Sequence, residues 1–256
     1  MSFTFEQYGD NPYNLAIIGC THGDETLGLK VINRLKEKMV KNVTYVIANK
    51  MAQEKGVRYI DTDLNRSFTT ESIGHNSGLL ENKLAGELDA FLSRFSHIID
   101  LHSTSFTVPG YFIIDSHQKL NLPTVNGTSL INRVYLIDGL EGALISRYRN
   151  AIAIEIGNNN NPLNIDIVTE SILDIMRNLN RGTRLNKEVY TWSGEVLKRD
   201  ISSLEKGLAD FSFVRKGEVI GYDNNGTPIL ANNDTYLLWV NLEDENVLCH
   251  RVERVL

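Results

Sequence analysis

Short motifs in this sequence carry residue types that together could bind a metal ion and activate water. In Gly19-Cys-Thr-His22-Gly-Asp-Glu25, an imidazole and a carboxylate lie three residues apart. This pair suits Zn²⁺, and a catalytic zinc ion usually takes three protein ligands and keeps one position open for water. The third ligand is expected from another strand end, and His102 in Asp100-Leu-His102-Ser-Thr is the natural candidate. The sequence therefore predicts one zinc ion per chain, held by His22, Glu25 and His102.

A metal that activates water also needs a proton acceptor beside it, and Glu155 is the candidate. It is the one carboxylate in the apolar run Ala151-Ile-Ala-Ile-Glu155-Ile-Gly157. Burying a carboxylate is costly unless it is paired or has a function, and burial raises its pKa toward the range useful for a general base. We therefore predict that Glu155 is the general base. The alternative is a core carboxylate paired with Arg147, Arg149 or a lysine.

A third motif, Arg58-Tyr-Ile-Asp-Thr-Asp-Leu-Asn65-Arg66, could recognise an acidic substrate. Arginine offers a planar fork for a carboxylate, and asparagine can donate or accept a hydrogen bond beside it. In a chain of net charge −6, such a loop would be a local anion-binding site. Asp61 and Asp63 are interpreted as carboxylates that order the loop.

Two residues beside the predicted ligands are interpreted as supporting ones. Asp100 is expected to orient a metal-binding histidine or to cap its loop, because carboxylates commonly fix a ligating imidazole. Cys20 lies two residues from His22 and could reach the metal. It is expected instead to pack at the strand end, because a thiolate ligand would weaken the Lewis acidity wanted here.

These motifs lie where predicted strands end, in a pattern of alternating strands and helices. Strands alternating with helices imply a mostly parallel sheet covered on both faces, and such sheets bind ligands at the carboxyl ends of their strands. Beyond about residue 186, short strands separated by turn signals predict a small β-rich domain. The predicted domains are therefore 1–186, α/β, and 187–256, β-rich. The strands are expected at residues 15–18, 43–48, 97–101, 111–114, 134–137 and 151–156, and the helices around 27–39, 79–95 and 168–180.

Size and composition are those of an ordinary globular protein. The chain has 256 residues, of which 42% are hydrophobic and 23% charged. Its net charge of −6 argues against nucleic-acid binding, which needs a basic stripe. The N-terminus has no basic region followed by an apolar run, and no apolar stretch approaches the ~20 residues that span a bilayer. Two cysteines are too few for a disulfide framework, so we expect a cytoplasmic protein without membrane partners.

In this combination and order, the motifs around His22, Arg58, His102 and Glu155 resemble those of the succinylglutamate desuccinylase/aspartoacylase family. That family belongs to the zinc carboxypeptidase-like superfamily. The resemblance implies a mostly parallel, mixed sheet flanked by helices and followed by a small β domain. It also implies hydrolysis of an N-acyl amino acid, with zinc on the three predicted ligands and Glu155 as base. By the same match, Arg58 polarises the scissile carbonyl, and Asn65 with Arg66 holds a substrate carboxylate.

The resemblance leaves part of the substrate site open. A further substrate arginine could be Arg147 or Arg149, and a tyrosine that closes on the substrate could be Tyr222 or Tyr236. Two other functions use the same residues: a zinc carboxypeptidase acting on short peptides, and a non-catalytic homologue that binds metal or a small acid. The intact Glu155 argues against the second. The acyl group, the amino acid and the formation of a homo-oligomer are not specified.

Overall fold

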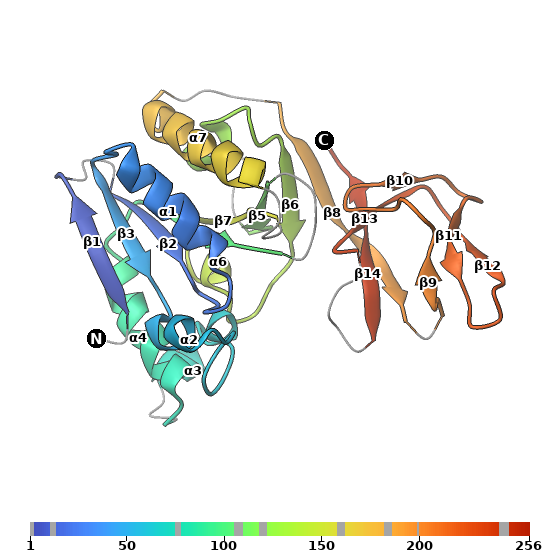
Figure 1. Cartoon of the computed structure of the whole chain (residues 1–256), viewed down its shortest axis with the longest axis horizontal. Helices are drawn as coiled ribbons and strands as arrows, with labels where there is room; N and C mark the ends of the chain where they lie inside the picture. The colour runs from blue at the N-terminus through green and yellow to red at the C-terminus, as the bar shows by residue number, and fades with distance from the viewer. Residues whose placement is uncertain are drawn as a thin grey trace. The chain divides into compact units, whose positions relative to one another are not determined.

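The chain separates into two compact units, with the division between Lys187 and Glu188 (Figure 1). All helices of the described chain lie in the N-terminal unit, and the C-terminal unit is built from strands. No helix among the described residues is long and apolar enough to cross a membrane. The computed structural model describes residues 3–10, 14–74, 78–104, 110–117, 122–157, 162–181, 186–198, 200–240 and 246–256.

A mixed, mainly parallel sheet forms the centre of the N-terminal unit, with neighbour order β1-β3-β2-β4-β7-β5-β6. Strands β3, β2, β4 and β7 are parallel, whereas β1 runs antiparallel to β3, and β5 antiparallel to β7. The predicted fold class is confirmed. The strands are β1 (Thr4–Tyr8), β2 (Leu15–Gly19), β3 (Val43–Ile47), β4 (His97–His102), β5 (Tyr111–Asp115), β6 (Arg133–Ile137) and β7 (Ala151–Glu155).

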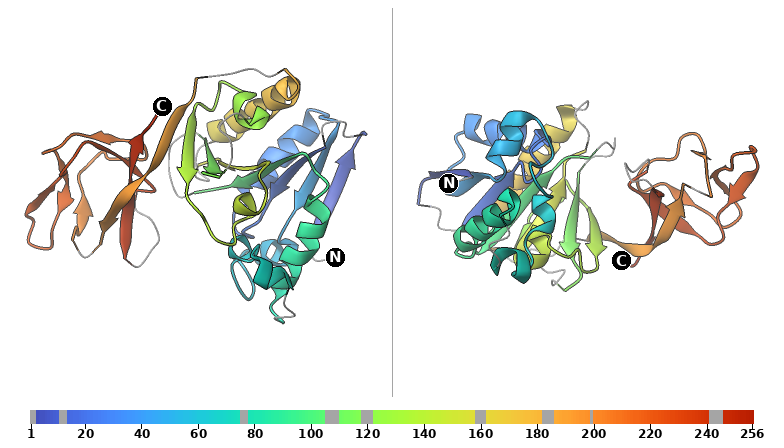
Figure 2. Two further views of the ribbon diagram at one scale, coloured as in Figure 1. Left: turned by 180° about the vertical axis from the view of Figure 1, so that it is seen from behind. Right: turned by 90° about the horizontal axis from the view of Figure 1, so that it is seen from below.

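Helices cover both faces of this sheet (Figures 1 and 2). Helices α1 and α7 pack together on one face, and α4 lies on the other. The helices are α1 (Leu27–Glu37), α2 (Lys50–Lys55), α3 (Thr70–Gly74), α4 (Leu80–Leu92), α5 (Pro123–Asn126), α6 (Leu144–Arg147) and α7 (Pro162–Asn178), with one 3₁₀ turn, η1 (Leu64–Arg66).

Helix α1 forms because its apolar side chains recur every four residues. Leu27, Val31 and Leu35 are buried on one face, as the spacing predicts. The four-residue spacing extends to Met39, but this side chain is exposed, because the helix ends at Glu37 and Met39 takes a left-handed backbone conformation.

Two glycines let the start of α1 lie close to the sheet. A Cβ atom on Gly28 would lie 3.1 Å from Leu101 Cβ and 3.3 Å from Gly19 Cα, so a larger residue would push the helix away. This close contact fixes the short loop between β2 and α1, which carries the first predicted metal ligands.

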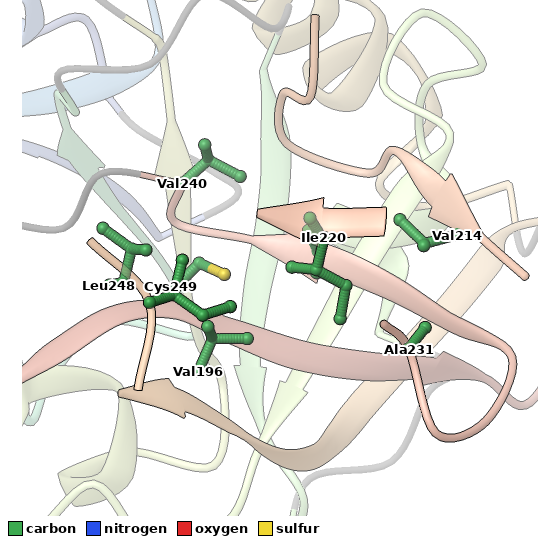
Figure 3. Packing of buried hydrophobic residues seen from close by; sticks show 9 residues of the cluster. Val196, Val214, Ile220, Ala231, Val240, Leu248 and Cys249 are labelled. Atoms are coloured by element: carbon green, nitrogen blue, oxygen red, sulfur yellow. The ribbon is translucent and has the colours of Figure 1, made fainter. Parts of the chain in front are cut away.

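The C-terminal unit consists of antiparallel strands around a hydrophobic core of its own (Figure 3). Cys249 is part of that core, and both Cys20 and Cys249 are buried free thiols. Within this unit, β8, β14, β13 and β10 are hydrogen-bonded in that order, and β12, β11 and β9 form a separate three-stranded sheet in the order β12-β11-β9. The strands are β8 (Glu188–Leu197), β9 (Ser203–Leu204), β10 (Phe213–Val214), β11 (Val219–Tyr222), β12 (Pro228–Leu230), β13 (Thr235–Leu238) and β14 (Val247–Arg254).

Candidate metal centre

The loop between β2 and α1 is a tightly packed turn that carries His22 and Glu25. Cys20 begins it in a left-handed conformation, with φ of 57°. A Cβ atom on Gly23 would lie 2.3 Å from the backbone carbonyl carbon of Ala52, so only glycine fits against this part of the backbone. The amide of Gly23 also donates a hydrogen bond to the carbonyl oxygen of Arg58, at 2.9 Å. The loop is therefore fixed to α2 and to the segment that follows it.

The structure brings His22, Glu25 and His102 together. His22 Nδ1 lies 2.6 Å from Glu25 Oε1, and His102 Nδ1 lies 3.0 Å from Glu25 Oε2. One ligand atom from each of the three residues lies within 4.8 Å of the others. The backbone amide of Ser103 also donates to Glu25 Oε2, at 3.0 Å. Both imidazoles thus present Nδ1 to the same carboxylate.

A further carboxylate holds each imidazole from its far side. His22 Nε2 lies 3.0 Å from Asp63 Oδ1, and His102 Nε2 lies 2.8 Å from Asp100 Oδ2. At His102, an Nε2–H donated to Asp100 leaves Nδ1 as the lone-pair atom of the neutral ring, which is the state that a metal ligand needs. At His22, Arg58 Nη2 also lies 2.9 Å from Nε2. Two imidazole nitrogens and a carboxylate are a common protein donor set for catalytic zinc, so these residues fit that ion.

The prediction for Asp100 matches the geometry, because its contact orients His102. The carboxylate is fully buried, and its Oδ1 accepts a hydrogen bond from Thr21 Oγ1 at 2.7 Å. Cys20 is likewise buried, with Sγ 3.8 Å from the carbonyl oxygen of Glu25. Burial raises the pKa of the Cys20 thiol to about 12, with nearby Glu25 adding to the effect. A thiol that stays protonated is a poor metal ligand, which agrees with its predicted packing role.

Ionised carboxylates make the centre favourable for positive charge. Burial lowers the pKa of His22, but hydrogen bonds to Asp63 and Glu25 outweigh it and raise that pKa. Burial also disfavours the charged form of His102, yet the charges of Asp100 and Glu25 raise its pKa well above the ordinary value. Protons and a metal ion compete for these imidazoles, so metal binding here should release protons.

Glu155 lies beside the metal-ligand cluster because of strand register. In the parallel pair β4–β7, Glu155 is the direct partner of His102. The residue is 9% exposed, and its Oε2 has no hydrogen-bond partner among the described residues. Burial raises the pKa of Glu155 to about 7, against the opposing effect of His102. A buried acceptor with an unpaired oxygen, poised near neutrality, is the arrangement that a general base needs.

Arg58 lies at the edge of the cluster, with its side chain 45% exposed. Its Nη1 is 3.2 Å from Glu25 Oε1, and its Nη2 is 3.3 Å from Asp63 Oδ2. The Asp63 side chain also accepts a hydrogen bond from the backbone amide of Asn65 at 2.8 Å and so caps the N-terminus of η1. The interpretation of Asp63 as a loop-ordering residue accounts for that bond but misses the contact with His22. No local pattern signals it, because the two residues are 41 positions apart.

Asn65 and Arg66 lie on η1, next to a second loop. Asn65 Oδ1 accepts a hydrogen bond from the amide of Leu144 at 2.9 Å. Gly142 packs so closely that a Cβ atom there would lie 2.2 Å from the carbonyl oxygen of Arg66. The Arg66 side chain is exposed, and its Nη1 donates to the carbonyl oxygen of Asn65 at 2.7 Å. The backbone of this pair is therefore fixed, whereas the arginine head group faces solvent.

The predicted substrate arginines have different surroundings. Arg147 forms a bidentate ion pair with Asp89 of α4, with Nε 2.9 Å from Oδ1 and Nη2 2.8 Å from Oδ2. Tyr148 also donates to Asp89, at 2.6 Å. This network favours a structural role for Arg147, joining α4 to the segment before β7, over substrate binding or pairing with Glu155. Arg149 is exposed, and its role stays a prediction.

Both candidate tyrosines lie within the C-terminal unit. The Tyr222 hydroxyl donates a hydrogen bond to Glu205. The Tyr236 ring packs edge-on against Tyr190, with ring centroids 5.1 Å apart. These contacts show how each tyrosine ring is held within the C-terminal unit. The choice between the two tyrosines stays open.

Comparison with known proteins agrees with this geometry. A family model described as the succinylglutamate desuccinylase/aspartoacylase catalytic domain matches residues 12–122, a segment that contains His22, Glu25, the Arg58 loop and His102. This part of the chain is therefore similar to the catalytic domain of that family. Glu155 lies beyond the matched segment.

Individual proteins extend the comparison. A probable aspartoacylase of Trichodesmium erythraeum (strain IMS101) is 32% identical over 120 residues, a match that spans 42% of this chain and only 41% of that protein. A probable aspartoacylase of Prochlorococcus marinus (strain MIT 9215) is 29% identical over 261 residues, covering 88% of this chain and 86% of the relative. The crystal structure of murine aminoacylase 3 has a TM-score of 0.78 at 21% identity, covers 98% and 96% of the two chains, and shows the same fold.

Proposed function

We propose that the protein is a zinc-dependent hydrolase that cleaves the amide bond of an N-acyl amino acid. The observation that carries this proposal is the convergence of His22, Glu25 and His102 beside the buried Glu155, whose Oε2 is unpaired among the described residues. Similarity to the succinylglutamate desuccinylase/aspartoacylase catalytic domain supports the reaction class, since the similar proteins include probable aspartoacylases.

In this proposal, His22, Glu25 and His102 hold the zinc ion. When bound, zinc supplies a Lewis acid that acidifies water and polarises a carbonyl group. Glu155 accepts a proton from the attacking water and later returns it to the nitrogen of the leaving amine. Arg58, at the exposed edge of the cluster, donates hydrogen bonds to the carbonyl oxygen as negative charge develops there.

Recognition of the substrate carboxylate is assigned to Asn65 and Arg66. The backbone amide of Leu144 donates a hydrogen bond to Asn65 Oδ1, which leaves the side-chain nitrogen Nδ2 of Asn65 as the donor for a ligand. The exposed guanidinium of Arg66 can form the paired hydrogen bonds that a carboxylate accepts. Holding this end of the substrate orients the amide bond toward Glu155.

Metal analysis combined with a substrate panel tests the proposal. Protein purified without chelators should contain one zinc ion per chain, and His102→Ala should lose it. The wild-type protein should hydrolyse N-acetyl or N-succinyl amino acids. Glu155→Gln should keep its zinc while kcat falls by about 10²–10⁴-fold.

The alternatives give different results in the same assays. Turnover of dipeptides without turnover of N-acyl amino acids would indicate a carboxypeptidase. Zinc binding without any hydrolysis would indicate a binding protein. Near-normal kcat in Glu155→Gln would remove Glu155 as the base, and absence of metal from the wild-type protein would refute the mechanism.

A further inference from the structure

A buried carboxylate outside the metal-ligand cluster holds the loop of residues 58–63. Glu81, in the first turn of α4, is 0% exposed. Three of its hydrogen bonds come from consecutive backbone amides of the loop, and a fourth comes from Asn49, which follows β3. The donors are Ile60 N (2.7 Å to Oε1), Asp61 N (3.0 Å to Oε2), Thr62 N (3.2 Å to Oε2) and Asn49 Nδ2 (3.1 Å to Oε1).

The chemistry of these contacts calls for an ionised carboxylate. Successive backbone amides that point to one place form an anion-binding concavity. An ionised Glu81 is an acceptor only, and its two oxygens can satisfy all four donors. A glutamine at this position would present an NH₂ group to backbone N–H groups, and a buried donor without an acceptor is costly. The loop therefore follows its present path only around the carboxylate.

Both ends of the held segment reach the metal centre. At one end, the carbonyl oxygen of Arg58 accepts a hydrogen bond from Gly23, the residue after His22. At the other end, Asp63 lies 3.0 Å from His22 Nε2. The remaining partner, Asn49, donates its backbone amide to Cys20, at the start of the same ligand-bearing turn. Glu81 is thus connected to the His22 loop by three routes.

We propose that Glu81 is a positioning residue of the metal centre. By fixing residues 60–62, it sets the place of Asp63, which holds the His22 imidazole with Nδ1 toward Glu25. It also sets the backbone of Arg58 beside the cluster. This inference rests on the proposed function, because it assigns the loop to zinc binding. Loss of the carboxylate should therefore weaken zinc affinity.

The test compares Glu81→Gln with Leu88→Ala, a matched change on the same helix. Leu88 is fully buried and apolar, so its truncation destabilises α4 without removing the carboxylate. Zinc affinity is measured by competition with a chromophoric chelator, well below the Tm of each variant. Hydrogen exchange of the amides of residues 60–62 is measured in parallel, and this readout requires no activity.

Glu81→Gln should lose protection at residues 60–62 and bind zinc about 10–100-fold more weakly. Leu88→Ala should lower the Tm but keep both the protection and the affinity. Glu81→Asp, which retains the charge, should recover part of the affinity. Unchanged affinity in Glu81→Gln, or equal losses in Glu81→Gln and Leu88→Ala, would overturn the inference.

Two outcomes separate this inference from the proposed function. If Glu81→Gln does not fold, the zinc affinity and the protection of residues 60–62 are compared between Glu81→Asp and Leu88→Ala instead. Equal losses in these two variants would overturn the inference. If the wild-type protein binds no zinc, the proposed function fails, and the role of Glu81 at the centre fails with it. If the wild-type protein binds zinc and Glu81→Gln binds it equally, only the role of Glu81 fails.

Discussion

The unfolding free energy of the metal-free protein should fall as pH rises, because the folded state buries Glu155. Burial raises the pKa of this carboxyl from the ordinary 4.5 to about 7. Below pH 4.5 the group is neutral in both states; above pH 7 it is charged in both, and the folded state must then bury the charge. Each pH unit between the two pKa values corresponds to about 1.4 kcal/mol. The folded state should therefore lose about 3 kcal/mol in total.

Urea unfolding of chelator-treated wild type and Glu155→Gln, followed by circular dichroism from about pH 5 to 8.5, measures this loss. The groups distant from Glu155 titrate alike in both proteins, so the difference between the two curves reports Glu155 together with its interaction with His102. The wild type should lose most of the ~3 kcal/mol relative to the variant over this range. Added zinc should reduce the difference, because a nearby cation favours the ionised carboxylate. Parallel curves would refute the argument that Glu155 titrates near neutrality.

Three further substitutions test other contacts. Asp100→Asn leaves one acceptor oxygen for Thr21 and His102, which now use two. Zinc affinity, measured by competition with a chelator, should therefore fall about 10–100-fold. Unchanged affinity would mean that His102 does not need this support. Gly23→Ala would place a Cβ atom 2.3 Å from the α2 backbone. The free energy of unfolding, measured by thermal denaturation, should therefore fall by about 1–3 kcal/mol. An unchanged Tm would contradict this close approach. Arg147→Ala breaks the partly exposed pair with Asp89 and should cost about 1 kcal/mol or less, with kcat/KM nearly unchanged. A large fall in kcat/KM would instead restore Arg147 as a substrate residue.

The strands and the ligand-bearing loops could be predicted because their signals are local. Strand β7 is an uninterrupted apolar run with one carboxylate, and β2 ends at the motif that contains His22 and Glu25. Strand β1 was not predicted, because four of its five residues are exposed and it lacks the alternation of a half-buried strand. Helix α7 was expected from residue 168 but begins at Pro162, because proline is tolerated in the first turn of a helix.

Apart from Asp100, the residues that support the centre could not be predicted, because their contacts connect distant parts of the chain. Glu81 contacts residues 19 to 32 positions away, and a glutamate in the first turn of a helix is ordinarily explained by the helix dipole alone. The interpretation of Arg147 failed to anticipate Asp89 for the same reason, since the two are 58 positions apart. Residue type and local spacing indicated which groups could do chemistry. Only the packing of α4 against the loops shows what holds them in place.

The pairing of β4 with β7 has a consequence for how this protein could change. His102 and Glu155 are direct partners on adjacent strands in the interior of the sheet, whereas Asn65 and Arg66 come from the short turn η1. The proposed base and the pair assigned to the substrate carboxylate therefore lie on separable parts of the chain. Loop substitutions can be selected for a new acyl amino acid while the strand pair keeps the reaction itself unchanged.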